Sequence, residues 1–430
     1  MTRFIQTTFP AEKAVAVGIY FKANRFRDSW PAPEAQAELI ELIRSSGLEV
    51  IREFTVRMER PVPRTMIGKG KGQEIHDVCH EMQPDVVIFG GDLSAVQQRN
   101  LEEAIGMKVI DRTQLILDIF AQRAHSQEGK VQVELAQLEY LLPRLAGQGV
   151  MLSRLGGGIG TRGPGEQKLE MDRRRIRQKI TRLKEDLRTI HQRRQIARKK
   201  REEEEVPTVA LIGYTNAGKS TLLNALTHAG TAVENRLFST LDPLARRLIL
   251  PDHQPVLLSD TVGFIHKLPH HLVEAFQATL EEVTESRLLL HVLDASHPMM
   301  EEQSEAVREV LELLGAQDKP ILLAFNKIDR LSSGTIEALK RKYPEAIFIS
   351  AATGAGLPHL LDRLSAGLSQ FMRQADILLG PGQEHWLEQI YSQGKVLVQE
   401  GAGASLQLKA RLPHRLYGQL KKAGLIRVSS

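Results

Sequence analysis

The sequence predicts an α/β protein that is divided into several domains. Its 430 residues exceed the roughly 100 to 200 residues of one compact domain. Short apolar runs alternate with amphipathic helical segments in the first part of the chain and again after residue 206, which is typical of α/β units. A long, strongly charged helical stretch separates these two parts. We therefore expect four domains, over residues 1–125, 126–206, 207–371 and 372–430.

The composition excludes several classes of protein. With 42% apolar and 25% charged residues, the chain matches ordinary globular proteins. No apolar run approaches the ~18 to 20 residues that span a bilayer, and the first residues lack the apolar core of a secretory signal. Cys79 is the only cysteine, which excludes an internal disulfide and a cysteine-based metal cluster. We expect a monomeric protein of the cytoplasm and leave peripheral membrane association open.

The first predicted domain alternates strands and helices. The expected strands span residues 15–21, 48–58, 85–89 and 108–110, and the expected helices span residues 34–44 and 93–104. Glycines and lysines alternate over residues 68–72, where backbone amides could hold an anion. A flexible loop is the more common interpretation of such a segment. Cys79 is expected to be a small buried apolar residue.

Two apolar seams predict a pair of antiparallel helices in the second domain. Both seams repeat at steps of four and three residues, the spacing at which helices pack along one stripe. The first consists of Val131, Leu135, Leu138, Leu142 and Leu145, and the second of Ile176, Ile180, Leu183, Leu187 and Ile190. Pro143 should kink or end the first helix near its last turn. Because neither helix can bury its stripe alone, we expect a helical hairpin.

The outer face of this hairpin is predicted to be basic. Residues 173–201 contain 14 Lys or Arg and only two acids, Glu185 and Asp186, within a chain of net charge +5. Six glycines in residues 156–166 would form the tip, where the backbone could approach a partner closely. A plain flexible turn is the alternative. If the hairpin binds nucleic acid, the candidate contacts are Arg154, Arg162, Arg173, Arg174, Arg175 and Arg177.

A phosphate-binding motif opens the third domain. The apolar run 208–212 predicts a buried strand that leads directly into G-Y-T-N-A-G-K-S, residues 213–220, which fits G-x-x-x-x-G-K-[ST]. Loop amides and the start of the next helix would surround the phosphates, with Lys219 on the β- and γ-oxygens and the Ser220 hydroxyl on Mg²⁺. The nucleotide-binding candidates in this segment are Gly213, Asn216, Ala217, Gly218, Lys219, Ser220 and Thr221.

Three later motifs predict a guanine nucleotide with a γ-phosphate as the ligand. The strand 256–260 ends in Asp260, which should hold Mg²⁺ through water, and the Gly263 amide should meet the γ-phosphate. In N-K-I-D, residues 326–329, Asp329 could accept two N–H groups of guanine that adenine lacks. A backbone amide of residues 350–352 could meet guanine O6. These motifs add Asn326, Lys327, Asp329, Ser350, Ala351 and Ala352 to the GTP-binding candidates.

The motifs over residues 207–371 resemble those of the Ras-like superclass of GTPases, in its translation-factor-related branch. The resemblance implies a P-loop GTPase domain with a mostly parallel sheet and hydrolysis of GTP to GDP and phosphate. It also implies that Thr240 of switch I binds Mg²⁺, with Ser239 and Thr231 as neighbouring alternatives. Catalytic roles would fall to Lys219, Thr240, Gly263 and Asn216.

Phe264 departs from the pattern of this superclass. It follows Gly263 at the place where many such GTPases have a glutamine that orients the attacking water, and its ring has no polar group for that task. Asn216 resembles the asparagine that binds K⁺ in GTPases that use a monovalent cation. K⁺ stimulation is therefore one hypothesis. The other is that Asn216 only forms hydrogen bonds within its own loop.

A further resemblance covers most of the first 370 residues. The run G-G-I-G-T-R-G-P-G-E-Q-K-L-E-M-D-R-R, residues 157–174, resembles the HflX family of ribosome-associated GTPases, and residues 65–71 and 109–120 match that family's amino-terminal domain. Residues 167–171 depart from the usual family sequence. Membership implies binding to the large ribosomal subunit and its RNA, dissociation of stalled or idle ribosomes in the GTP state, and resetting by hydrolysis. The alternative is an RNA-binding assembly factor in which GTP only tunes affinity.

The last part of the chain completes the predicted fold class. Alternating patterns at residues 395–399 and 406–412 predict two strands. The whole chain is thus expected to comprise an N-terminal α/β domain, an antiparallel helical hairpin, a Ras-like P-loop GTPase domain and a small C-terminal α/β domain.

Overall fold

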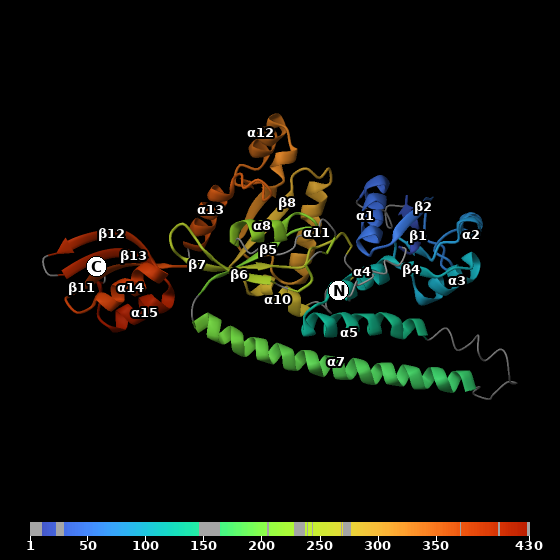
Figure 1. Ribbon diagram of the computed structural model, residues 1–430, viewed down its shortest axis with the longest axis horizontal. Coiled ribbons are helices and arrows are strands. Elements are labelled where there is room, and N and C mark those ends of the chain that lie inside the picture. Colours follow the sequence, from blue (N-terminus) through green and yellow to red (C-terminus); the bar gives the residue numbers. More distant parts are fainter. Residues whose placement is uncertain are drawn as a thin grey trace, which may run out of the picture. The chain divides into compact units, whose positions relative to one another are not determined.

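A computed structural model of the chain (Figure 1) describes residues 11–22, 30–145, 164–203, 206–227, 237–238, 240–242, 244–267, 269, 277–369, 371–402 and 405–427. These residues form two compact units. The first comprises Met1–Thr189, Arg236–Phe238 and Pro269–Phe276, and the second comprises Ile190–Asn235, Ser239–Leu268 and Gln277–Ser430. The division into four domains stays a prediction. No described helix is long and apolar enough to cross a membrane.

A parallel four-stranded sheet forms the N-terminal part of the first unit. Its strand order is β2-β1-β3-β4. The strands are β1 (Lys13–Phe21), β2 (Glu49–Met58), β3 (Val86–Phe89) and β4 (Val109–Asp111). The helices are α1 (Ala32–Ser45), α2 (Lys69–Met82), α3 (Ala95–Ile105) and α4 (Arg112–Arg123). The expected strand–helix alternation is confirmed, and α4 is an addition that the residue pattern did not predict.

The segment over residues 68–72 is a helix start and not a flexible loop, so that prediction was wrong. Gly68 occupies the N-cap position and α2 begins at Lys69. Gly72, Ile75 and Cys79 are the buried residues of this helix, at a spacing that places them on one face. Burial of this face outweighs the low helix propensity of glycine. The same burial raises the pKa of the Cys79 thiol to about 11.

Two antiparallel helices follow, as expected. They are α5 (Gln127–Arg144), which ends directly after Pro143, and the 40-residue α7 (Pro164–Glu203). Part of each predicted seam packs together in a cluster of Val131, Leu135, Leu138, Ile180, Leu183 and Leu187. Lys184 lies 2.8 Å from Glu139 across this interface, and Lys179 pairs with Glu134 in the same way. The expected tip, which includes Arg154 and Arg162, lies outside the described residues.

A six-stranded sheet forms the centre of the second unit. Its order is β10-β9-β8-β5-β7-β6, with every neighbouring pair parallel except β6 and β7. The strands are β5 (Thr208–Ile212), β6 (Leu244–Ile249), β7 (Pro255–Asp260), β8 (Leu288–Asp294), β9 (Ile321–Asn326) and β10 (Ile347–Phe348). This mostly parallel sheet confirms the predicted fold class.

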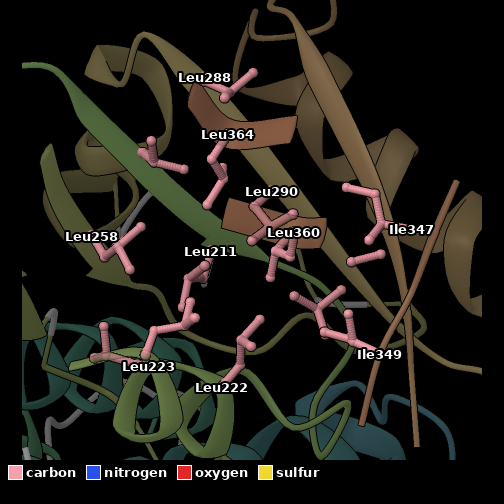
Figure 2. Close-up of a cluster of buried hydrophobic side chains, with 14 of the residues drawn as sticks. Leu211, Leu222, Leu223, Leu258, Leu288, Leu290, Ile347, Ile349, Leu360 and Leu364 are labelled. Carbon is pink, nitrogen blue, oxygen red and sulfur yellow. The ribbon is translucent and has the colours of Figure 1, made fainter. Parts of the chain in front are cut away.

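Helices cover both faces of this sheet. They are α8 (Lys219–Thr227), α10 (Gln277–Glu285), α11 (Met300–Leu313), α12 (Ser333–Lys342) and α13 (Leu357–Ser369). On one face, Leu222 and Leu223 of α8 and Leu360 and Leu364 of α13 pack against the strands (Figure 2). Leu293 and Phe325 pack with residues of α11 and α12 in a separate cluster. Because successive residues of a strand face opposite sides, a buried strand such as β8 is apolar on both faces, with His291 and the terminal Asp294 as its polar residues.

A second, antiparallel sheet forms the C-terminal part. Its order is β12-β13-β11-β14. The elements are β11 (Arg373–Leu379), α14 (Glu384–Gln393), β12 (Lys395–Ala402), β13 (Ser405–Leu412), α15 (His414–Lys422) and β14 (Ile426–Arg427). Both predicted strands are present, and the helices supply Ile390, Leu416 and Leu420 to its core.

Candidate active site

The candidate site lies at the carboxyl edge of the six-stranded sheet. Asp260, Asp294 and Asn326 are the last residues of β7, β8 and β9. The phosphate loop follows β5, which pairs in parallel with both β7 and β8. Ligands of open α/β sheets bind at this edge, where the strand order changes direction. The topology therefore brings together motifs that lie far apart in the sequence.

The phosphate loop has a backbone that only particular residues tolerate. Gly218 has a φ of +94°, and a Cβ there would lie 2.3 Å from Nδ2 of Asn326. Asn216 has a φ of +62°, a conformation that asparagine tolerates better than most residues. Asn326 donates from Nδ2 to the carbonyl of Ala217 at 2.9 Å. The glycine thus lets the guanine-recognition motif pack directly on the loop.

Lys219 is buried against this loop. Its Nζ donates to the carbonyl oxygens of Gly213 and Tyr214, each at 3.0 Å. Burial lowers the pKa of Lys219 to about 8, and the nearby charge of Asp260 opposes that shift. The ammonium group is therefore still mostly charged at neutral pH. A charge held in a loop of backbone amides is suited to phosphate oxygens.

Two hydroxyl groups and one carboxylate converge beside Lys219. Ser220 Oγ donates to Asp260 Oδ2 at 2.6 Å, Thr240 Oγ1 donates to the same oxygen at 3.0 Å, and the two hydroxyls are 2.8 Å apart. The structure brings Thr240 to this cluster, while Ser239 and Thr231 lie outside the described residues. Burial raises the pKa of Asp260, against the opposing effects of Lys219 and the hydroxyl donors.

This cluster fits a magnesium ion. Its donors are all oxygens, which Mg²⁺ prefers. Asp260 Oδ1 is buried and has no hydrogen-bond partner in the described part of the chain. Buried polar atoms are rarely left unpaired in proteins, so this oxygen is suited to water or a cation. Within the same residues, no group of three or more His, Cys, Asp and Glu side chains could hold a metal ion, so the two hydroxyl groups are essential members of this candidate site.

Gly263 and Phe264 hold the loop that follows β7 against the phosphate loop. A Cβ on Gly263 would lie 2.8 Å from Cα of Thr215 and 3.2 Å from Nζ of Lys219. The amide of Thr215 donates to the carbonyl of Phe264 at 2.7 Å, and the amide of Phe264 donates to that of Gly213 at 3.1 Å. The Phe264 side chain is only 1% exposed. It lies in the core and cannot orient a water molecule.

The guanine-recognition residues form a bonded network. Lys327 donates from Nζ to Asp294 Oδ2 at 2.7 Å and to the carbonyl of Asn216 at 2.8 Å. Burial alone would raise the pKa of Asp294, but hydrogen bonds from Lys327 and Ser296 outweigh it and lower that pKa. Asp329 follows on an exposed 3₁₀ turn (Ile328–Arg330), where its carboxylate faces solvent. Lys327 therefore links the phosphate loop to the end of β8, while Asp329 is accessible to a ligand.

The structure reduces the number of backbone amides in residues 350–352 that could bind guanine O6. The amide of Ser350 donates to the carbonyl of Ala355, and the amide of Ala351 donates to Asn326 Oδ1 at 2.9 Å. Of the three amides, that of Ala352 has no hydrogen-bond acceptor within the described residues and is the candidate for guanine O6. Ala351 contributes by orienting Asn326.

Sequence reasoning missed Asp294 and Tyr214. Asp294 ends an apolar strand in the same way as Asp260, so its position at the strand end was an available signal. Tyr214 accepts a hydrogen bond from the amide of His266 at 2.8 Å and forms a bridge with Phe264. Nothing in the local pattern predicts this link, because x positions of the phosphate motif accept any residue.

Four of the six candidate RNA-binding arginines are described, all on α7. Arg173 and Arg177 lie 3.8 and 3.6 Å from Glu170, and Arg175 lies 3.7 Å from Asp172. Arg174 is exposed. Surface pairs of this length contribute little stability. Arg175 and Arg177 are also exposed, whereas Arg173 is half-buried.

Sheet, phosphate loop and guanine motif together define a P-loop GTPase. Three family models match the chain: "GTP-binding GTPase N-terminal" over residues 34–121, "GTP-binding GTPase Middle Region" over residues 123–201 and "50S ribosome-binding GTPase" over residues 208–327. The chain belongs to the HflX family of GTPases.

Individual relatives extend over almost the whole chain. A GTPase HflX of Caldanaerobacter subterraneus is 46% identical over 90% of both chains, and that of Escherichia coli is 43% identical over 94% of both. Among solved structures, a GDP complex of SsGBP aligns with a TM-score of 0.45 at 26% identity, covering 83% of this chain and 99% of the other.

Proposed function

We propose that this GTPase binds the large ribosomal subunit and, in its GTP state, dissociates stalled or idle ribosomes into subunits, with hydrolysis resetting it. The observation that carries the proposal is the convergence of Ser220, Thr240 and Asp260 beside Lys219. Such a cluster responds to the presence of a γ-phosphate, and the basic helix α7 supplies a surface for RNA. The name "50S ribosome-binding GTPase" of the matching family model supports the choice of partner. That partner would place the protein in the cytoplasm.

The nucleotide would be held by three groups of residues. Lys219 and the loop amides would bind the β- and γ-phosphates, and the Gly263 amide would meet the γ-phosphate. Ser220, Thr240 and Asp260 would hold Mg²⁺, which would neutralise charge on the phosphates. Asp329 would bind guanine, with the Ala352 amide on O6. Thr240 would contact the ion only while switch I is closed, which ties this contact to the GTP state.

The attacking water would need a group other than the residue after Gly263. Phe264 is buried, so a monovalent cation near Asn216 is one source of that function. Hydrolysis rates measured in KCl and in NaCl test this, with Asn216→Ala as the control. A K⁺ stimulation that Asn216→Ala abolishes supports the cation, and equal rates in both salts exclude it.

RNA would contact the side of α7 that faces away from the α5 seam. Arg174, Arg182 and Arg188 are exposed there and make no ion pair with any described residue. Helical periodicity places all three outside the apolar stripe. Lys179 and Lys184 differ, because both are paired with glutamates of α5. The three arginines are therefore the better candidates for phosphate contacts.

Sedimentation through sucrose gradients tests the function directly. Purified ribosomes are mixed with the full chain and a non-hydrolysable GTP analogue or GDP. Release of subunits with the analogue alone supports the proposal. Intact ribosomes that carry the protein would instead indicate the alternative, an RNA-binding assembly factor whose affinity GTP tunes.

Two sets of variants identify the RNA-binding surface in the same gradients. Replacing Arg174, Arg182 and Arg188 by alanine should weaken co-sedimentation and reduce its dependence on salt. Replacing Lys179 and Lys184 by alanine should have the smaller effect, because both are already neutralised by glutamates. Equal effects of the two sets would mean that α7 contributes only general positive charge.

A further inference from the structure

The two helices of the C-terminal part pack on one and the same face of its antiparallel sheet. Ile377 of β11 and Leu408 of β13 lie in a buried cluster that Ile390 of α14 and Leu416 of α15 complete. Because successive side chains of a strand point to opposite faces, the residues that alternate with Ile377 and Leu408 lie on the other face of the sheet. This other face is the one that carries charge.

Three cations lie together on that face. Lys409 and Arg411 of β13 alternate with the buried Leu408 and Ala410, so they point away from the helices. Lys395 of β12 lies directly opposite Arg411 in the register of the two strands. Lys395 and Lys409 are exposed, and Arg411 is half-buried. Lys395, Lys409 and Arg411 together form the basic face of the sheet.

The acids of the same face do not neutralise this cluster. Asp376 of β11 lies opposite Lys409 on one side and opposite Arg427 of β14 on the other, so two cations flank a single carboxylate. Glu400 of β12 lies opposite Gln407 and not opposite a cation. None of the three cations of the basic face forms an ion pair with another residue that the structure describes.

A role in stability does not account for the basic face. Lys395 and Arg411 are like charges at directly opposed positions, an arrangement that destabilises a sheet. Charged residues also protect the edges of sheets from pairing with other chains, which is a sufficient reason for Lys395 on the edge strand β12. Lys409 and Arg411 lie on β13, which is paired on both sides, so edge protection does not explain them. A bound anion would offset the repulsion.

We propose that the basic face is a second RNA-binding surface, separate from α7, that contacts the phosphate backbone of structured RNA. Residues two apart on a strand are about 7 Å apart, so the cations are spread over a row that suits a chain of phosphates better than one small anion. The described residues of this face include no aromatic ring on which a base could stack, so the contact should be independent of RNA sequence. The inference rests on the proposed function only for the identity of the RNA as ribosomal.

The experiment measures equilibrium binding of the full chain to a labelled RNA duplex over a series of KCl concentrations. All proteins lack the three α7 arginines named above, so that α7 does not hide the contribution of the sheet. The test variant carries Lys395→Gln and Lys409→Gln. The matched control carries Lys421→Gln and Lys422→Gln, which remove two exposed charges from the last turn of α15, on the helix-covered side of the same sheet. GDP affinity serves as the measure of correct folding in each protein.

The test variant should bind the duplex about tenfold more weakly at low salt, and the slope of log K against log[salt] should fall by about one to two. The control should stay within about twofold of its parent, and GDP affinity should stay unchanged in both. Equal losses in the two variants, no loss in the test variant, or no binding by the parent would overturn the inference. Loss of binding to phosphatidylglycerol vesicles with unchanged RNA binding would also overturn it, in favour of a membrane surface.

The outcome is independent of the test of the proposed function, because binding to an RNA duplex requires neither GTP nor ribosomes. Weaker RNA binding in the test variant, together with no release of subunits by the wild type in the sucrose gradients, would contradict the proposed function alone. Release of subunits by the wild type, with RNA binding unaffected in the test variant, would contradict the basic face alone.

Discussion

One strand in each of two sheets of this protein ends in an aspartate, and the two aspartates have opposite surroundings. Asp111, at the end of β4, accepts four bonds at 2.8 to 3.1 Å, from the amides of Leu93 and Gln114, the Tyr140 hydroxyl and Arg144. Asp260, at the end of β7, accepts the hydroxyls of Ser220 and Thr240 on one oxygen, while its buried Oδ1 has no partner among the described residues. A fully bonded carboxylate supports the fold, and one with an unused oxygen is available to a ligand.

The surroundings of Asp111 show how a strand-end carboxylate becomes structural. Arg144 stacks on the Tyr140 ring, with its guanidinium carbon 3.4 Å from the ring centroid. Burial, followed by the charge of Asp111 and the hydrogen bond to it, raises the pKa of Tyr140. The tyrosine therefore stays protonated and keeps donating to Asp111. This network joins β4 to the last turn of α5.

The largest effect is expected from Asp111→Asn. An amide cannot neutralise Arg144, and its NH₂ group would face donors. Removing one partner of a buried charge pair should lower the free energy of unfolding of the N-terminal unit by about 3 kcal/mol or more. Urea unfolding measures the loss, and affinity for GDP should stay unchanged. A loss below about 1 kcal/mol would contradict the structural role of this aspartate.

The corresponding substitution in the six-stranded sheet, Asp260→Asn, should lower the rate of GTP hydrolysis rather than the stability. Asp260→Asn keeps the shape of the side chain but removes the charge that would hold Mg²⁺ through water. We expect hydrolysis of GTP to fall about 10- to 100-fold, with the unfolding free energy equal or higher, because a buried charge is lost. A rate close to wild type would show that Asp260 is as structural as Asp111.

His291 provides a smaller test, because it is an unpaired polar group in the middle of a strand. Its Nε2 has no partner among the described residues, and burial lowers its pKa from 6.5 to about 3. The unfolded chain thus binds a proton below pH 6.5 that the folded chain binds only near pH 3. Stability from the neutral ring is complete above pH 6.5 and is lost as the pH falls towards 3.

Between pH 7 and pH 5 the wild type should therefore lose about 2 kcal/mol more stability than His291→Leu. Urea unfolding at the two pH values measures this difference. Identical losses in the two proteins would mean that the ring is already solvated in the folded state.

The sequence predicted those features whose signal lies within one short segment of the chain. The 4-3 spacing of apolar residues predicted the α5–α7 seam, and the order of phosphate, D-x-x-G and N-K-x-D motifs predicted the nucleotide site. Both signals lie within short segments. Because the strand ends are parallel neighbours, the topology then brings these segments together.

Contacts between distant segments could not be predicted in this way. Asp111 and Arg144 are 33 residues apart, and Ser45 and Leu237 are 192 residues apart. The start of α2 was missed because its closely spaced glycines have the local propensity of a loop, while burial of Ile75 and Cys79 decides the outcome. Tertiary packing determines all three features, and no single-segment pattern contains it.

Calorimetric titration with a non-hydrolysable GTP analogue, with and without Mg²⁺, tests the central claim most directly. The proteins compared are the wild type, Asp260→Asn and Asp111→Asn at a temperature where all three are folded. A magnesium site at Ser220, Thr240 and Asp260 predicts that Mg²⁺ strengthens binding in the wild type and in Asp111→Asn but not in Asp260→Asn. Undiminished strengthening by Mg²⁺ in Asp260→Asn would contradict it.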